Sequence, residues 1–334
     1  MGLRRRRRRD GATRVFYAAD LHGSELAWRK FVAAAHFYDV DVLVFGGDLM
    51  GKVLVPIVRE NGRFLARFLG EDHVLDEGAL PQFVRAIETS GFYWKVMDRD
   101  EYAAVRDDPL AQRGLFQEKA AERLAAWLSL AEERLADSGV RAYLTGGNDD
   151  DPGVLEVLER HRGERVHACE GRVVELDAEH TMITVGLSTF TPWDTPREAS
   201  EEEIGATIEA ALAGVPDVGR CVFNLHCPPK DSPLDVCLKL EPASGLPPAE
   251  LPRPVRVGGR FVTTGGGSAA VRDAIRAHQP TVGLHGHIHE SPGRFRIGRT
   301  QCFNPGSEYG QGILQGVVIS LSGGRLVGYQ HTSG

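Results

Sequence analysis

The chain has 334 residues, of which 42% are hydrophobic and 25% charged, with a formal net charge of −7. This length is enough for one large domain or two small ones around a buried core, and the acidic balance argues against a dedicated nucleic-acid binder. The five cysteines are scattered without a Cys-x-x-Cys pair, which excludes a disulfide framework or zinc ribbon and indicates a reducing compartment.

The N-terminus carries a basic block, Arg4 to Arg9, followed by Asp10-Gly11 instead of an apolar segment. It is therefore not a secretory signal. We interpret residues 1–12 as a disordered basic tail, with a contact to nucleic acid or another acidic surface as the alternative. No apolar run reaches the roughly 18–20 residues that cross a bilayer, so we expect a soluble, cytoplasmic protein without a membrane partner.

The first third of the chain predicts a βαβ unit with a long insertion. Arg14 to Ala19 indicates a strand, Ser24 caps a helix that runs to about Tyr38, and the apolar run Asp41 to Phe45 is typical of a strand buried on both faces. Residues 52–139 exceed what a crossover needs, and their pattern is helical at 81–90 and 115–138. We expect a largely helical insertion within a single domain that spans residues 13–334.

The rest of the chain alternates strands and helices. Strands are predicted at 141–145, 166–168, 172–176, 182–186, 221–224, 281–284, 294–297, 301–303, 316–321 and 325–330, and helices at 152–160, 201–213 and 269–278. The strands at 172–176 and 182–186 are expected to form a hairpin. The Pro- and Gly-rich segment 229–267 is too long for a simple connector and is typical of a functional loop.

Polar residues follow five of these strands. They are Asp20 and His22, Asp48, Asn148, His226, and the pair His287 and His289. In open α/β sheets, sites gather at the carboxyl ends of strands, so these side chains can converge although they are far apart in sequence. Oxygen and imidazole ligands without thiolates suit Mn²⁺, Fe²⁺ or Zn²⁺. Seven ligands are too many for one ion and suit two ions that share a bridging carboxylate.

These segments resemble, in order, the five motifs of the calcineurin-like metallophosphoesterase superfamily. The motifs are Asp20-Leu-His22, Gly47-Asp48, Gly147-Asn148-Asp149-Asp150, Asn224-Leu-His226 and Gly286-His287-Ile-His289. The resemblance covers the chain from about residue 14 to its end, with the insertion after Asp48 as the main departure. It implies a four-layer α/β/β/α sandwich, in which two mixed β-sheets lie face to face with helices outside.

The resemblance also implies a role for each residue. Asp20, His22 and His289 would hold the first metal, and Asn148, His226 and His287 the second, with Asp48 bridging the two. Among candidate ions, Mn²⁺ is favoured over Fe²⁺ and Zn²⁺. A metal-bridging hydroxide would attack phosphorus in line with the leaving group, and Asn148 would also orient the phosphate.

Asp149 departs from the family pattern, because many members carry a histidine there that is proposed to protonate the leaving oxygen. Aspartate is ionised at pH 7 unless its surroundings raise its pKa. Asp149 is therefore either a perturbed catalytic acid, a residue beside a leaving group that needs no acid, or a cap of the helix that begins near Pro152. Asp150 is expected to support the site from behind the ligands.

Other residues near the motifs have weaker claims. Cys227 and His285 are expected to be structural, and Asn304 to support the last histidine motif. Three cations could reach a phosphate: Lys52, Lys230 and Arg294.

The expected function is hydrolysis of a small phosphorylated substrate, most readily a phosphodiester. The alternatives are a phosphomonoesterase or protein phosphatase, a metal-free scaffold of the same fold, and a nuclease, which only the Arg block favours. The sequence leaves open the substrate itself, the oligomeric state and the roles of the insertion and of segment 229–267.

Overall fold

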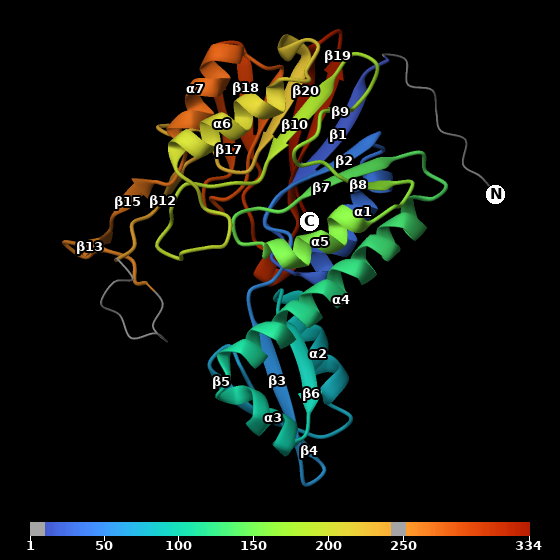
Figure 1. Cartoon of the computed structure of the whole chain (residues 1–334), viewed down its shortest axis with the longest axis vertical. Helices are drawn as coiled ribbons and strands as arrows, with labels where there is room; N and C mark the ends of the chain where they lie inside the picture. The colour runs from blue at the N-terminus through green and yellow to red at the C-terminus, as the bar shows by residue number, and fades with distance from the viewer. Residues whose placement is uncertain (1–10, 242–251) are drawn as a thin grey trace.

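The computed structural model describes residues 11–241 and 252–334 (Figure 1). The Arg4 to Arg9 block, with nearly all of the basic tail expected at 1–12, and residues 242–251 of the expected functional loop lie outside the described residues. Among the helices of the described part, none has the length and apolar character needed to span a membrane.

Two six-stranded mixed sheets form the centre of the molecule. The first has the order β20 (Arg325–Ser333), β19 (Gln315–Ser322), β1 (Thr13–Ala18), β2 (Val42–Gly46), β7 (Arg141–Thr145), β8 (Val166–Ala168). The second has the order β17 (Gly293–Ile297), β18 (Thr300–Asn304), β16 (Val282–Leu284), β11 (Cys221–Leu225), β10 (Thr181–Val185), β9 (Val174–Glu175). Strands β9 and β10 pair antiparallel, as the sequence predicted.

Successive side chains of a strand point to opposite faces of its sheet, and this explains why the two sheets pack face to face. On β1, Val15 and Tyr17 belong to an apolar cluster shared with the second sheet, to which Val222 and Phe303 contribute. The intervening Phe16 and Ala18 face the other way and join a cluster with helices. Because successive side chains point to opposite faces, a strand that is apolar throughout can be buried on both sides.

Helices cover the outer face of each sheet and complete the predicted four-layer sandwich. Outside the first sheet pack α1 (Glu25–Phe37), α4 (Pro109–Leu135) and α5 (Pro152–Arg160), and outside the second pack α6 (Glu201–Leu212) and α7 (Ala269–His278). The hydroxyl of Ser24 caps α1 by accepting a hydrogen bond from the backbone of Ala27, as expected. The fold class inferred from the sequence is confirmed.

The insertion between β2 and β7 contains a sheet that the sequence analysis did not predict. It holds α2 (Leu80–Thr89), α3 (Arg99–Arg106) and much of α4, but also a four-stranded sheet with the order β5 (Glu71–Leu75), β4 (Arg63–Phe68), β3 (Leu54–Glu60), β6 (Tyr93–Met97) (Figure 1). The expectation of a largely helical segment therefore needs correction to an α/β subdomain with its own apolar cluster.

Two tight turns in the insertion account for this difference. Asn61-Gly62 joins β3 to β4 and Leu69-Gly70 joins β4 to β5, and all four residues have positive φ. Positive φ at both central residues is the mark of a two-residue hairpin turn, for which Asn-Gly is a strong sequence signal. That signal was present, but the flanking arginines and glutamates obscured the alternation of Phe64, Ala66 and Phe68.

Segment 229–267 is also partly ordered into strands. Strand β12 (Val236–Leu238) pairs with β15 (Thr263–Gly265), and β13 (Arg256–Val257) pairs with β14 (Arg260–Phe261). The ribbon formed by β12 and β15 projects beside the carboxyl ends of the second sheet (Figure 1). Residues of both strands, Leu238 of β12 and Gly265 of β15 among them, line a cavity together with Asp48 and His289.

Candidate metal centre

The seven predicted ligands lie together at the carboxyl ends of β1, β2, β7, β11 and β16. The loop after β1 runs beside the loop after β2, since Asp20 N donates to Gly47 O at 2.9 Å and His22 N donates to Asp48 O at 3.0 Å. Four of the seven predicted ligands have positive φ: 59° at Asp20, 41° at His22, 55° at Asp48 and 68° at His287. Such conformations cost energy in residues other than glycine, and they cluster where function requires a fixed side-chain direction.

Asp20, His22, Asp48 and His289 form a first cluster of ligand atoms. The two Nε2 atoms of His22 and His289 lie 3.0 Å apart. Asp20 Oδ1 is 3.6 Å from Nε2 of His289, and Asp48 Oδ2 is 3.5 Å from Nε2 of His22. Asp20, His22 and Asp48 are buried, whereas the side chain of His289 is 31% exposed and faces the opening of the site.

Asp48, His226 and His287 form a second cluster, which Asn148 joins through its amide oxygen. Asn148 Oδ1 lies 3.1 Å from Nε2 of His226 and 2.8 Å from Nδ1 of His287. The other ring nitrogen of His226, Nδ1, lies 2.8 Å from the Gly46 carbonyl oxygen. Donation of the Nδ1 proton to that carbonyl leaves Nε2 free as a ligand.

Asp48 stands between the two clusters. Its Oδ2 atom is 3.5 Å from Nε2 of His22 in the first cluster and 3.5 Å from Nε2 of His226 in the second. Its other oxygen, Oδ1, accepts a hydrogen bond from the backbone of Asp149 at 3.0 Å, which fixes the carboxylate. This is the place of the predicted bridging ligand.

The residues fit divalent metal ions by spacing and by chemistry. Atoms that bind one ion at about 2.0–2.2 Å lie about 3–3.5 Å from one another, and the ligand-atom pairs described above are 2.8–3.6 Å apart. Two imidazole nitrogens that face each other across 3.0 Å, beside buried carboxylates, are a typical ligand arrangement. The assignment of each residue to one ion remains a prediction.

The histidine pKa values follow from burial and from Asp48. Burial lowers the pKa of His22, and burial together with His226 lowers that of His287 to about 4, so both imidazoles are neutral and able to bind a metal. Burial also works against a charge on His226, but Asp48 and Asp20 outweigh it and raise its pKa to about 9. A cation beside Asp48 would compete with the His226 proton.

Two glycines of the motifs are needed because the ligands approach the backbone closely. A Cβ atom at Gly47 would lie 2.5 Å from Nδ1 of His226, and Gly47 has a φ of 115°. A Cβ atom at Gly286 would lie 2.5 Å from Oδ2 of Asp20. Larger residues at these positions would push the ligands apart, which explains the Gly-Asp and Gly-His pairs.

Asp150 connects the loop that carries Asp48 to the loop that carries Asn148, in keeping with the supporting role expected for it. It is fully buried and accepts hydrogen bonds from the backbone N–H groups of Leu49 at 2.9 Å, Met50 at 2.7 Å and Gly147 at 2.7 Å. The loops that carry Asp48 and Asn148 are therefore tied to one carboxylate.

Asp149 does not cap α5. The N-cap of that helix is Asp151, whose carboxylate accepts from the backbone of Gly153 at 2.8 Å, so the capping interpretation of Asp149 is wrong. Asp149 instead faces the site, forms an ion pair with Lys52 and lies 3.8 Å from Nδ1 of His22. Burial and the charge of Asp48 raise the pKa of Asp149 to about 6, although Lys52 opposes this.

A supporting residue that the sequence analysis missed is Thr195. Its hydroxyl accepts a hydrogen bond from Nδ2 of Asn148 at 2.9 Å and donates to Glu198 at 2.8 Å. The backbone N–H of Arg197 donates to the backbone carbonyl oxygen of Asn148 at 3.1 Å. Thr195 follows no strand and belongs to no motif, so no local signal marked it.

The remaining candidates are structural or lie elsewhere. His285 is buried with Nδ1 2.8 Å from the Leu225 carbonyl, and Cys227 is buried with its pKa raised to about 12 by burial. Asn304 donates to the Ile288 carbonyl at 2.8 Å and so supports the loop between the last two histidines. Lys230 and Arg294 do not line the cavity at the clusters, whereas Lys52 does.

The cavity above the two clusters has a volume of about 590 Å³. Asp48, Asn148, Asp149, His287 and His289 form its floor. Its walls come from the loop of residues 190–193 and from β12 with the residues that follow it. This size suits a small organic ligand.

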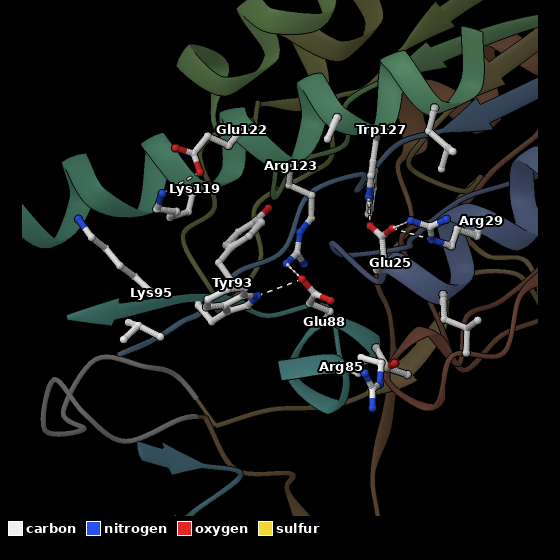
Figure 2. Close-up of a pocket in the computed structure, with 16 residues that line it drawn as sticks. Glu25, Arg29, Arg85, Glu88, Tyr93, Lys95, Lys119, Glu122, Arg123 and Trp127 are labelled. Atoms are coloured by element: carbon white, nitrogen blue, oxygen red, sulfur yellow. Dashed lines mark hydrogen bonds and ion pairs between the residues drawn. The ribbon is translucent and has the colours of Figure 1, made fainter. Parts of the chain in front are cut away.

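A second cavity, of about 890 Å³, lies where the insertion meets α1 (Figure 2). Arg123 of α4 lines this cavity and donates to the Gly23 carbonyl at 3.0 Å and to the Phe92 carbonyl at 2.9 Å. Tyr93 accepts a hydrogen bond from the backbone of Gly51 at 2.8 Å. Gly23 and Gly51 lie just beyond His22 and Asp48, so the insertion is attached to both ligand loops.

Comparisons with known proteins show similarity at the level of structure. No family model and no curated protein matches the chain. One solved structure aligns with 96% of this chain and 99% of its own, at 15% identity and a TM-score of 0.53. The protein TT1561 of Thermus thermophilus aligns with 97% of this chain and 98% of its own, at 12% identity and a TM-score of 0.51. Yfce, a phosphoesterase from E. coli, aligns over 95% of this chain and 98% of its own, at 12% identity and a TM-score of 0.31. At identities of 12–15%, the similarity to the first two structures shows a shared fold alone.

Proposed function

We propose that this chain, which has the calcineurin-like metallophosphoesterase fold, is a metal-dependent hydrolase of phosphoesters and acts most readily on a phosphodiester. The observation that supports the proposal most strongly is the position of Asp48 between the two clusters. Its Oδ2 atom is 3.5 Å from Nε2 of His22 in the first cluster and 3.5 Å from Nε2 of His226 in the second. A shared carboxylate between two groups of imidazole and oxygen ligands is what a two-metal hydrolase needs.

Each residue has a role in this proposal. Asp20, His22 and His289 would hold one divalent ion, and Asn148, His226 and His287 would hold a second, with Asp48 as the ligand between them. When bound, two such ions, for which Mn²⁺ is favoured, polarise the phosphoryl group and lower the pKa of water. The chain supplies a buried setting that strengthens these charges, and the amide of Asn148 orients the phosphate.

Lys52 and Asp149 decide which leaving group suits the site. With a pKa of about 6 and an ion pair to Lys52, Asp149 is mostly ionised at pH 7 and is a poor proton donor there. Lys52 places a positive charge beside the phosphate, partly offset by the carboxylate of Asp149 with which it is paired. This arrangement favours esters whose leaving group departs without a strong acid, such as activated phosphodiesters.

Three other functions are weaker candidates. A phosphomonoesterase or protein phosphatase would share the metal chemistry. Many such enzymes have a histidine at the position of Asp149, and its absence here argues against this function. A metal-free scaffold would have no reason to bring seven coordinating side chains to such short separations. A nuclease draws support only from the Arg block, which lies outside the described residues.

A substrate comparison tests the proposal. The purified full-length chain, loaded with Mn²⁺, is assayed with bis-p-nitrophenyl phosphate and with p-nitrophenyl phosphate, before and after removal of metal by a chelator. We expect the diester to be hydrolysed with the larger kcat/KM and the activity to disappear with the metal. Activity that survives complete removal of metal would contradict the proposal.

A further inference from the structure

The walls of the cavity above the metal clusters are apolar on both sides. One wall is the loop 190–193, in which the side chains of Phe190 and Trp193 are 71% and 49% exposed. The other wall includes Leu238, which is 37% exposed, and Leu240. Large aromatic side chains are usually buried, so two of them left open beside a polar floor indicate a surface for a ligand.

The aromatic wall is fixed to the second metal cluster. Its loop continues to Thr195, which accepts the hydrogen bond from Asn148, and Glu198 accepts from both Thr191 and Thr195. The backbone of Trp193 donates to the Thr191 hydroxyl at 3.1 Å. Phe190 and Trp193 are thus held at a defined position relative to a predicted metal ligand.

The aliphatic wall is fixed to the loop that carries His289. The carboxylate of Glu290 accepts from the backbone of Leu238 at 3.2 Å, and Ser291 donates to the Val236 carbonyl at 2.5 Å. Strand β12 is also paired with β15. Both walls are therefore anchored next to metal ligands, as expected of a site that orients an organic group relative to a phosphate.

We propose that the substrate is a nucleotide-like phosphoester, whose flat aromatic ring stacks on Trp193 and Phe190 while its phosphate lies on the metal clusters. This inference rests on the proposed function and names the substrate class of the same site. Stacking suits every base, because each has a flat π face, and Leu238 of β12 together with Leu240 just beyond it provides an apolar surface for the opposite side of the ring. The lining holds three carboxylates, Asp48, Asp149 and Glu290, against two lysines, Lys52 and Lys239, so the bound metal ions would supply the positive charge that an anionic ligand needs.

Equilibrium binding tests this inference without requiring turnover. Thymidine 5′-monophosphate and methyl phosphate are titrated by calorimetry into the Mn²⁺-loaded full-length chain. We expect the thymidine compound to bind about tenfold more tightly, since loss of one stacking contact has an effect of this size. The double variant Trp193→Ala, Phe190→Ala should lose this advantage to within about twofold, because both side chains are exposed and their removal leaves the fold intact.

The matched control is Phe37→Ala, which removes another exposed aromatic side chain, on α1 and away from the cavity. It should keep the preference. Equal binding of the two probes by the native chain, or a preference retained in the double variant, would overturn the inference. A native chain that prefers the thymidine compound but hydrolyses no phosphoester would support this inference and contradict the proposed function.

Discussion

The side-chain amide of Asn148 donates a hydrogen bond to the hydroxyl of Thr195 over 2.9 Å. The bond determines which end of the amide faces the ligands, because it engages Nδ2 and leaves Oδ1 toward His226 and His287. A residue outside the five motifs therefore orients one of the predicted metal ligands. Partners of this kind commonly change metal affinity by 10- to 100-fold.

Thr195→Val tests this relationship, because valine keeps the shape of threonine without its hydroxyl. We expect the affinity for the more weakly bound Mn²⁺ to fall about tenfold, measured by calorimetry, with a parallel fall in kcat. The control Thr207→Val makes the same change on α6, where the hydroxyl bonds only to the backbone of Glu203, and should leave both values unchanged. Equal effects of the two variants would mean that Thr195 does not position Asn148.

Metal binding should release a proton near pH 7. Asp48 and Asp20 raise the pKa of His226 to about 9 despite its burial, so its imidazole is protonated at pH 7 without a metal. A metal must displace that proton, and therefore the apparent affinity should rise with pH up to about 9. The measurement is the Mn²⁺ binding enthalpy in two buffers of different ionisation enthalpy at pH 7. An enthalpy independent of the buffer would show that His226 binds without losing a proton.

Asp149→His should shift the selectivity toward monoesters. Asp149 faces the site, with its Oδ2 atom 3.8 Å from Nδ1 of His22. A histidine in its place can donate a proton to a poor leaving group, which ionised Asp149 cannot. We expect the ratio of monoester to diester kcat/KM to rise at least about tenfold. Asp149→Asn is the control, since it removes the charge without adding an acid. The same ratio in both variants would assign the effect to charge alone.

Arg123→Met tests the attachment of the insertion to the metal loops. The side chain of Arg123 is only 10% exposed and satisfies the carbonyls of Gly23 and Phe92, which methionine cannot do. We expect the free energy of unfolding to fall by about 2–3 kcal/mol, measured by denaturant titration, and Mn²⁺ affinity to fall as well. Lys119→Met, one turn earlier on α4 in surface ion pairs, should cost less than about 1 kcal/mol. Unchanged Mn²⁺ affinity in Arg123→Met would show that the insertion does not support the site.

The main sheets could be predicted from the sequence because their strands carry unmixed apolar runs. Residues 42–46 are all buried, and such a run has few alternatives to a central strand. The ligands after these strands could be predicted for the same reason, since each comes directly after a strand end. The order of the motifs then predicted that these distant residues form two groups of metal ligands, and the structure brings them together in two clusters.

The insertion and the supporting residues could not be derived in this way. Strands β3 to β5 mix charged and apolar residues, and only the Asn61-Gly62 turn marked them as a hairpin. Thr195 and Arg123 act through hydrogen bonds to residues 47 and 100 positions away in the sequence, Asn148 and Gly23. Such contacts depend on tertiary packing, which no local pattern reports.

The shared carboxylate of Asp48 is the centre of this account, and metal content tests it most directly. The native chain and Asp48→Asn are purified, dialysed against Mn²⁺ and measured by elemental analysis, with circular dichroism to confirm that both are folded. We predict two equivalents of Mn²⁺ per native chain, and at most one in Asp48→Asn together with loss of turnover. Two equivalents and near-native activity in the variant would contradict the bridging role, and a native chain without stoichiometric metal would contradict the metal centre itself.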